Sequence, residues 1–519
     1  MQEGRTINSI RNIISGFFGK TVTLIYPFII RTVIIYTLGV QYLGLSSLFS
    51  SILQVLNMAE LGFSSAIVYS MYEPIANNDA KKICSLMSLY RNIYRVIGCI
   101  ILGFGIVISF FLDKLISGSY PNDINIYILF YMYLFNTVIS YFLFAYRSCL
   151  LTAHQRSDIV NNIQTIVIFL QYTAQLIILL CLKNYYIYFI FTPLFTVLNN
   201  CIAGIWSKKK YPQYKCEGVV PKDDRAGIIK RVSGLMIQKI SAVSRNSFDN
   251  IFISAFLGLI ASAMYANYYY IMSAVYSMIA IIIPSLTASV GNSLLTETQE
   301  KNYKDFQKIS FVYLWIAGWF SICLYCLYQP FMKLWVGSEL MLPKATMTLF
   351  CIYFYQNCFG DIFSLYIQAA GLWWKVKHIY ALNAFANIIM NYLLVRLWGI
   401  WGVLIATIIT SLLLGSLSIG AALFKNCFKD HLYRSYLLKS LLFVILIVGI
   451  AFITDNIISI IAFSNSLKSF FVKIILCFSV PNIILVAVFH NNELFIVMKE
   501  LLINLFGRVF FKLKDKLHK

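Results

Sequence analysis

The sequence predicts an all-α polytopic membrane protein with about 14 transmembrane helices, and three observations support this. Hydrophobic residues make up 60% of the chain and the mean hydropathy is +0.75, which is more apolar than a soluble chain of 519 residues. The apolar residues are grouped in segments near the ~20 residues that cross a hydrocarbon core of about 30 Å. Lys and Arg fall almost entirely in alternate gaps between these segments.

The apolar segments follow one another along most of the chain, separated by short polar gaps. Each segment is long enough to cross a membrane as a helix. The predicted helices cover residues 12–37, 44–71, 87–112, 124–149, 159–182, 185–206, 232–257, 264–290, 306–328, 346–370, 378–396, 399–424, 437–458 and 469–489.

The placement of the basic residues predicts the orientation. With a cytoplasmic N-terminus, 32 of the 42 Lys and Arg lie in cytoplasmic pieces and 7 lie on the opposite side. This imbalance predicts that both termini are cytoplasmic and that the number of helices is even. The net charge of +21 therefore needs no nucleic-acid partner, because basic cytoplasmic loops also attract anionic membrane lipid. The tail 490–519, both apolar and basic, is expected to lie on the cytoplasmic leaflet as an amphipathic helix.

The sequence contains no pattern typical of a metal site, a cofactor site or an enzyme. The 12 Cys are scattered, and the CxxC of Cys323 and Cys326 falls within a predicted membrane helix, where packing is the expected role. The 5 His do not pair at metal-ligand spacing, and no phosphate-binding glycine loop is present. Any transport would therefore not be driven by an ATPase within this chain.

Two internal matches predict a repeat of six helices. Gly16–Gly39 aligns with Leu235–Gly258 at an offset of 219, which places Lys20 on Lys239 and the two Leu-Gly pairs on each other. Predicted helices 4–5 align with helices 10–11 at an offset of about 217. Both halves would start in the cytoplasm, so the repeat is parallel, with a pseudo-twofold axis along the membrane normal. Such halves imply a cleft near the midplane that opens to each side in turn.

The repeat predicts the domain organisation. Two accessory helices and a tail follow the second half. The predicted parts are an N-terminal six-helix half 1–206, a basic cytoplasmic loop 207–231, a C-terminal six-helix half 232–424, two accessory transmembrane helices 425–489 and the amphipathic tail 490–519.

Six ionisable side chains inside the predicted helices are candidates for function, because charge within the membrane is costly and usually functional. An arginine fork suits a phosphate or pyrophosphate, and Arg31, with no local partner in sequence, is the best single candidate for a ligand contact. Structural roles compete for the others: Arg245 and Asp249, at i and i+4, can neutralise each other, and Lys239 can extend to the surface. The candidates are Arg31, Lys239 and Arg245 for substrate binding, and Glu60, Asp249 and Asp361 for coupling or charge pairing.

The first part of the chain resembles a known family. The stretches that carry the resemblance are Leu38-Gly39, then Tyr42-Leu43-Gly44-Leu45, then Leu53 to Phe63, and Pro74 to Asn77. Over about residues 1–95 this is similar to the N-terminal signature of bacterial polysaccharide repeat-unit flippases, of the O-antigen, capsule and exopolysaccharide types. Their superfamily also holds multidrug and toxic compound extruders and lipid II flippases.

The resemblance implies a transporter in the bacterial cytoplasmic membrane that turns an undecaprenyl-pyrophosphate-linked oligosaccharide from the inner to the outer leaflet. It implies a cationic cleft for the headgroup, and cycling driven by a Na⁺ or H⁺ gradient or the membrane potential. Arg31 matches the family's intramembrane basic residue, and Glu60 lies within the signature. A monomer that works beside a polysaccharide polymerase and chain-length machinery is expected.

Three alternatives remain. A cation-coupled multidrug exporter of the same fold would need an acid-lined pocket, and the intramembrane cations here at least equal the acids. A polysaccharide polymerase or ligase would need a large outward loop with catalytic Arg or His, and the predicted outward loops are short and poor in both. A structural scaffold would not need paired halves with internal charges.

Overall fold

The structure is a computed structural model that describes residues 19, 22–60, 62–460, 466–496 and 499. Among these residues the regular structure is helical throughout, without a strand, which confirms the all-α expectation. Lys20 and most of the predicted tail helix 490–519 lie outside the described residues.

The helices follow each other with short connections. Short 3₁₀ turns interrupt them at Asn57–Glu60, Leu112–Leu115, Ala145–Arg147 and Ser338–Leu340, and a π-helical stretch covers Ser411–Leu417. The helices are Val22–Thr37, α2 Val40–Leu56, α3 Phe63–Ala76, α4 Ala80–Ser109, α5 Ile126–Phe142, α6 Ser148–Ala153, α7 Ser157–Cys181, α8 Tyr185–Lys210, α9 Lys222–Ile279, α10 Ile282–Thr296, α11 Gln299–Val336, α12 Lys344–Ala369, α13 Trp373–Thr410, α14 Ser418–Cys427, α15 His431–Ile460 and α16 Ser466–Phe489.

The predicted number of membrane helices fits this arrangement. In the described part of the chain, 8 helical stretches are long and apolar enough to cross a membrane, and a bent pair, α5 with α6, can form a ninth. Two of the stretches, Lys239–Thr296 and Trp373–Cys427, each contain two predicted segments. Three predicted segments remain, at 12–37, 44–71 and 346–370. They correspond to the shorter helix Val22–Thr37, to the broken pair α2 and α3, and to the less apolar α12.

Two predicted helices are broken near their middle. The segment predicted at 44–71 contains the turn Asn57–Glu60, and α3 then starts after Gly62, whose φ of 98° favours glycine. The segment predicted at 264–290 is interrupted between Ile279 and Ile282. Pro284 lacks the N–H that would bond four residues back, so it favours this second break.

The predicted internal repeat is visible in the backbone. Gly39 and Gly258, 219 positions apart, both have positive φ, at 118° and 85°, and each separates two helices. The starts of α3 and α10, and those of α4 and α11, are separated by the same number of residues. Positive φ also recurs 216 positions apart, in Gln155 with Gly371 and in Lys183 with Gly399. These coincidences confirm the repeat at both offsets.

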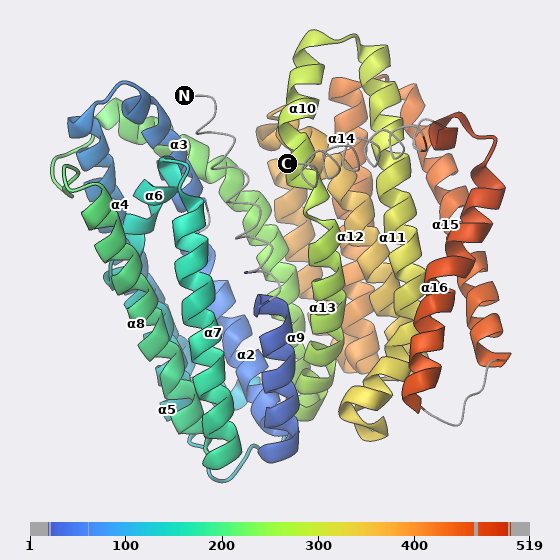
Figure 1. Ribbon diagram of the computed structural model, residues 1–519, viewed down its shortest axis with the longest axis horizontal. Coiled ribbons are helices and arrows are strands. Elements are labelled where there is room, and N and C mark those ends of the chain that lie inside the picture. Colours follow the sequence, from blue (N-terminus) through green and yellow to red (C-terminus); the bar gives the residue numbers. More distant parts are fainter. Residues whose placement is uncertain (1–18, 20–21, 61, 461–465, 497–498, 500–519) are drawn as a thin grey trace, which may run out of the picture. The chain divides into compact units, whose positions relative to one another are not determined.

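The chain divides by packing into two compact units. Unit 1 comprises Met1–Ala266 with Ala384–Val403, and unit 2 comprises Asn267–Asn383 with Leu404–Lys519. Within unit 1, α5 packs between α4 and α8, and α7 packs on α8; within unit 2, α11 packs against α12, α15 and α16 (Figure 1). The predicted halves 1–206 and 232–424 were defined by the sequence repeat, whereas the two units are defined by packing. The predicted domain boundaries therefore stay a prediction.

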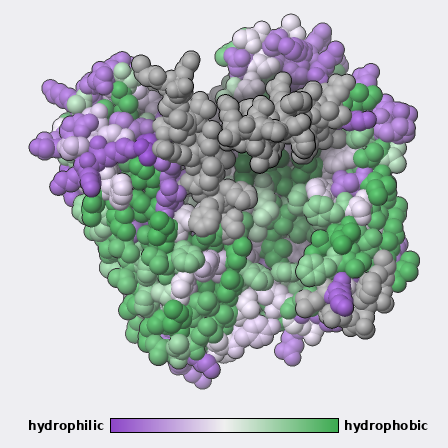
Figure 2. All heavy atoms as spheres, viewed as in Figure 1, coloured by the Kyte–Doolittle hydropathy of each residue, from purple (hydrophilic) through white to green (hydrophobic). Residues whose placement is uncertain are grey.

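The surface of each unit is apolar over the middle of its helices. In unit 1, large side chains such as Phe104 on α4 and Phe135 on α5 are more than half exposed. In unit 2, Leu442 and Phe452 on α15 are also more than half exposed. On the face shown in Figure 2, hydrophobic residues cover the middle of α7 and α8, and hydrophilic ones gather at the helix ends. A soluble protein would not expose this much apolar surface, whereas membrane lipid covers it at no cost.

Candidate functional site

Arg31 lies in a tyrosine-rich part of unit 1. Its side chain is partly buried on the helix Val22–Thr37. Its charge lies within electrostatic range of the hydroxyl groups of Tyr172, Tyr185 and Tyr188, which come from α7 and α8. The charge of Arg31 therefore acts on tyrosine hydroxyls of two neighbouring helices.

Arg245 and Lys239 lie on α9, also in unit 1. Lys239 is exposed, whereas Arg245 is partly buried. The Nε of Arg245 is inaccessible to solvent and has no hydrogen-bond partner among the described residues. A buried guanidinium N–H without an acceptor is costly, so this donor is available to an anionic group that approaches α9.

Asp249 is fully buried one turn beyond Arg245. Its carboxylate accepts hydrogen bonds from the side-chain amide of Asn391 at 2.6 Å and from the hydroxyl of Tyr265 at 3.1 Å. The next residue, Asn250, donates to the hydroxyls of Ser47 and Ser51 on α2 at 2.9 and 3.0 Å. Two neutral donors of unit 1, an amide and a phenol, thus hold this carboxylate.

Glu60 lies at the break between α2 and α3. Its Oε1 accepts a hydrogen bond from Tyr94 at 2.5 Å and its Oε2 accepts one from Tyr141 at 2.7 Å. Tyr141 also lies 3.1 Å from the side-chain oxygen of Asn57, and Tyr90 donates to the hydroxyl of Tyr94 at 2.6 Å. The acid therefore binds tyrosines of α4 and α5 rather than the cation on a neighbouring helix that a structural pairing would require.

Asp361, on α12 of unit 2, has a similar environment. Tyr276 donates to both carboxylate oxygens, at 2.9 and 3.0 Å, and Tyr313 donates to Oδ2 at 2.9 Å. Gln356, on the same helix, donates to the hydroxyl of Ser411 at 2.6 Å and not to Asp361. Each unit thus contains one carboxylate held by two tyrosine hydroxyls.

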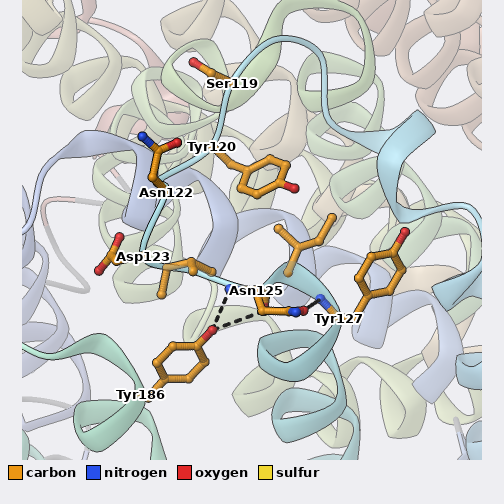
Figure 3. A pocket seen from close by; sticks show the side chains of 9 residues that line it. Ser119, Tyr120, Asn122, Asp123, Asn125, Tyr127 and Tyr186 are labelled. Atoms are coloured by element: carbon orange, nitrogen blue, oxygen red, sulfur yellow. Dashed lines mark hydrogen bonds between the residues drawn. The ribbon is translucent and has the colours of Figure 1, made fainter.

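A hollow of about 650 Å³ lies at the end of unit 1 where α4 connects to α5. Figure 3 shows its lining, in which the Tyr186 side chain approaches the backbone of Asn125. The Tyr186 hydroxyl accepts from the Asn125 N–H at 2.6 Å, and Tyr42 donates to Asp123 at 2.5 Å. These bonds anchor the connection, and none of the predicted site residues lines the hollow.

The basic loop between α8 and α9 is docked on unit 1. Val220 in the loop is buried, and Lys82 on α4 forms an ion pair at 3.3 Å with Asp224, in the first turn of α9. At the start of the loop, the ring of Tyr211 stacks on that of His154, with centroids 4.1 Å apart. Partial burial lowers the pKa of His154, and the charge of Lys210 adds to this, while a hydrogen bond to the Leu150 carbonyl opposes it.

Sequence reasoning found the six ionisable residues but missed most of their partners. The repeat contains a signal that finds two of them, because Tyr94 and Tyr313 coincide at the offset of 219. In the described part of the chain, no group of three or more His, Cys, Asp or Glu is arranged to hold a metal ion.

No protein-family model matches this sequence, and no curated protein matches it either. Solved structures do match. The lipid II flippase MurJ in an inward closed conformation gives a TM-score of 0.67 at 15% identity, over 93% of this chain and 99% of that one. An inward-facing multidrug resistance MATE family transporter of the MOP superfamily gives 0.60 at 14% identity, over 80% of this chain and 99% of that one.

The chain has the fold of these transporters. A third match, a mutant of the MATE transporter VcmN of Vibrio cholerae, gives a TM-score of 0.54 at 13% identity, over 83% of this chain and 99% of that one. At these identities the likeness establishes the fold, and the multi-pass membrane character agrees with the apolar surfaces of both units.

Proposed function

We propose that the protein is a flippase that moves undecaprenyl-pyrophosphate-linked oligosaccharide repeat units from the cytoplasmic to the outer leaflet by alternating access. The observation that carries the proposal is the cationic character of unit 1. Arg31 and Arg245 are both partly buried, and the Nε of Arg245 has no acceptor among the described residues. Arginine forks bind phosphate oxygens in pairs, and a pyrophosphate is the charged part of this substrate.

A lipid-linked headgroup needs such a protein. Its phosphates and sugars would each lose hydration in hydrocarbon, at a cost of several kcal/mol per unsatisfied polar group. Arginines can replace water around the phosphates. The polyprenyl tail can remain in lipid throughout.

The extent of the matched fold is compatible with a lipid-linked substrate, and the fold itself is shared with multidrug transporters. The lipid II flippase structure covers 93% of this chain, whereas the MATE transporters named above cover 80% and 83%. A cation gradient or the membrane potential would drive the cycle in the bacterial cytoplasmic membrane. The products would pass to a polysaccharide polymerase and chain-length machinery.

The experiment is to delete the gene and locate the lipid-linked oligosaccharide. Intact repeat units trapped on the cytoplasmic leaflet, protected from enzymes added outside spheroplasts, would support the flippase. Single units that these enzymes reach would indicate a polymerase. Unchanged glycan with new drug sensitivity would indicate a multidrug exporter of the same fold.

Complementation then tests the cationic side chains. Arg31→Ala and Arg245→Ala should fail to restore export while the protein remains in the membrane. Arg396→Ala is a matched control, because Arg396 lies over the ring of Phe256, with its guanidinium carbon 5.1 Å from the ring centroid, rather than beside the candidate residues. Export by both test variants at the wild-type rate would contradict the proposed role.

A further inference from the structure

The clusters around Glu60 and Asp361 occupy equivalent places in the repeat. Tyr94 on α4 and Tyr313 on α11 lie 219 positions apart, and each donates to the carboxylate of its own unit. The helix breaks next to the clusters, before α3 and before α10, coincide at the same offset. The two clusters therefore use the same three helices of each six-helix repeat.

The acid and the second tyrosine lie on different helices of the repeat in the two clusters. The helix that carries the acid in one unit corresponds to the helix that carries the second tyrosine in the other. In unit 1 the acid, Glu60, follows α2 and the second tyrosine, Tyr141, is on α5. In unit 2 the acid, Asp361, is on α12, which corresponds to α5 in the repeat. The second tyrosine, Tyr276, is on α9 at the position that corresponds to Asn57 beside Glu60.

This exchange shows whether the two clusters are alike because of how they pack or because of the chemical groups that they contain. A packing requirement would place side chains of similar volume at matching positions, because cores respond to each added methylene. Here the residue types at matching positions differ, yet each unit assembles one carboxylate and two phenol donors. What the units share is the chemistry of the cluster.

A carboxylate between phenol hydroxyls can hold or release a proton without repacking. The ionised acid accepts both hydroxyl hydrogens, and the protonated acid donates its own hydrogen to a hydroxyl oxygen that can also accept. In unit 1 the titratable groups around Glu60 are Tyr94 and Tyr141, with Tyr90 behind Tyr94 and Cys149 near Tyr90. In unit 2, Asp361 is surrounded by Tyr276, Tyr313 and Cys358.

Unit 1 also contains a chain of hydroxyl groups that leads to the acid. Tyr90, which is 1% exposed, donates to Tyr94, and Tyr94 donates to Glu60. A proton can move along such a chain by exchange between successive oxygens.

We infer that Glu60 and Asp361 are equivalent proton-binding sites, one in each unit, and that the hydroxyl chain of Tyr90 and Tyr94 leads the proton to Glu60 in unit 1. This rests on the proposed function, because it names the proton as the coupling ion of the flippase. Proton binding itself is measurable on the purified protein without any transport.

The test is infrared difference spectroscopy of the purified full-length protein in lipid while the pH is changed. Protonation of each acid should appear as a carboxyl C=O band, and Glu60→Gln and Asp361→Asn should each remove one band. Tyr94→Phe and Tyr313→Phe should each move the band of their own unit to higher frequency, because the carbonyl loses a hydrogen-bond donor. Bands that persist unchanged in both acid variants would overturn the inference.

Two controls separate this role from a structural one. Tyr133→Phe removes a buried hydroxyl that bonds Tyr185 at 2.9 Å, and both carboxyl bands should remain unmoved. If Glu60→Gln does not fold, Tyr94→Phe still decides, because it leaves the acid in place; an unmoved band would count against the site.

The export assay separates the two proposals. Export of lipid-linked oligosaccharide that is independent of the proton gradient, together with absent carboxyl bands, would retain the flippase and overturn the proton sites. Carboxyl bands that behave as expected in a protein whose deletion leaves the glycan unchanged would retain the sites and overturn the flippase.

Discussion

Tyr94 and Tyr313 lie 219 positions apart, and each donates a hydrogen bond to a carboxylate of its own unit, to Glu60 at 2.5 Å and to Asp361 at 2.9 Å. This pair of tyrosines connects the repeat in the sequence with the two carboxylate clusters. The starts of α3 and α10, and of α4 and α11, which confirm the repeat, lie close to these tyrosines in the sequence. Four further measurements follow from the structure and the orientation predicted for it.

The orientation can be tested by inserting alkaline phosphatase, which is active only outside the cytoplasm. An insertion after Ser119, between α4 and α5, should be active, and one after Gln213, between α8 and α9, should be inactive. The physical reason is the excess of Lys and Arg retained on the cytoplasmic side. The reverse result would place both termini outside the cytoplasm and overturn the predicted direction of transport.

Arg31→Lys should be less damaging to export than Arg31→Ala but should not match the wild type. Lysine keeps the charge and loses the fork that binds two phosphate oxygens at once. A charge-assisted hydrogen bond contributes roughly 1.5–3 kcal/mol, so its loss should slow export about 10- to 100-fold. The rate at which repeat units become accessible outside spheroplasts measures this, normalised to the amount of protein in the membrane. Equal rates for all three proteins would exclude a phosphate contact.

Gly44→Ala should destabilise unit 1. A Cβ at Gly44 would lie 2.2 Å from the backbone oxygen of Leu259, which cannot rotate away. Overpacking of this kind costs about 1–3 kcal/mol, so the midpoint of thermal unfolding in detergent should fall. Gly103→Ala is the matched control, since nothing lies within 4 Å of its Cβ and alanine favours a helix. A midpoint unchanged by Gly44→Ala would mean that α2 can move away from Leu259.

His154 should make the stability of unit 1 depend on pH. Partial burial, with the charge of Lys210, lowers the pKa of His154 in the folded protein, whereas in the unfolded chain histidine titrates near ~6.5. The unfolded state thus binds more protons between the two values, and the free energy of unfolding falls as the pH drops below about 6.5.

His154→Phe keeps a ring against Tyr211 and removes the titrating group. It should flatten the pH dependence of thermal unfolding across roughly pH 5 to 8. His378→Phe, at an exposed position on α13, is the control and should leave that dependence unchanged. A pH profile that is the same in His154→Phe and in the wild type would show that another group is responsible.

The sequence by itself determined the number of membrane segments, the predicted orientation and the repeat. Hydropathy, the placement of charge and self-similarity are read from the order of residues, and each depends on local physics: every apolar segment must satisfy its own backbone hydrogen bonds in lipid. The same local rule identified the six ionisable candidates, because a charge inside an apolar segment is visible without any knowledge of its neighbours.

Only the tertiary structure decided what those candidates bind. The partners of Glu60 come from α4 and α5, and one of the two partners of Asp249 comes from α13, far along the chain, so no local pattern contains them. A tyrosine in an apolar helix looks the same in sequence whether it faces lipid, an acid or another ring. Helix packing makes that choice, because it decides which hydroxyl finds a partner away from water.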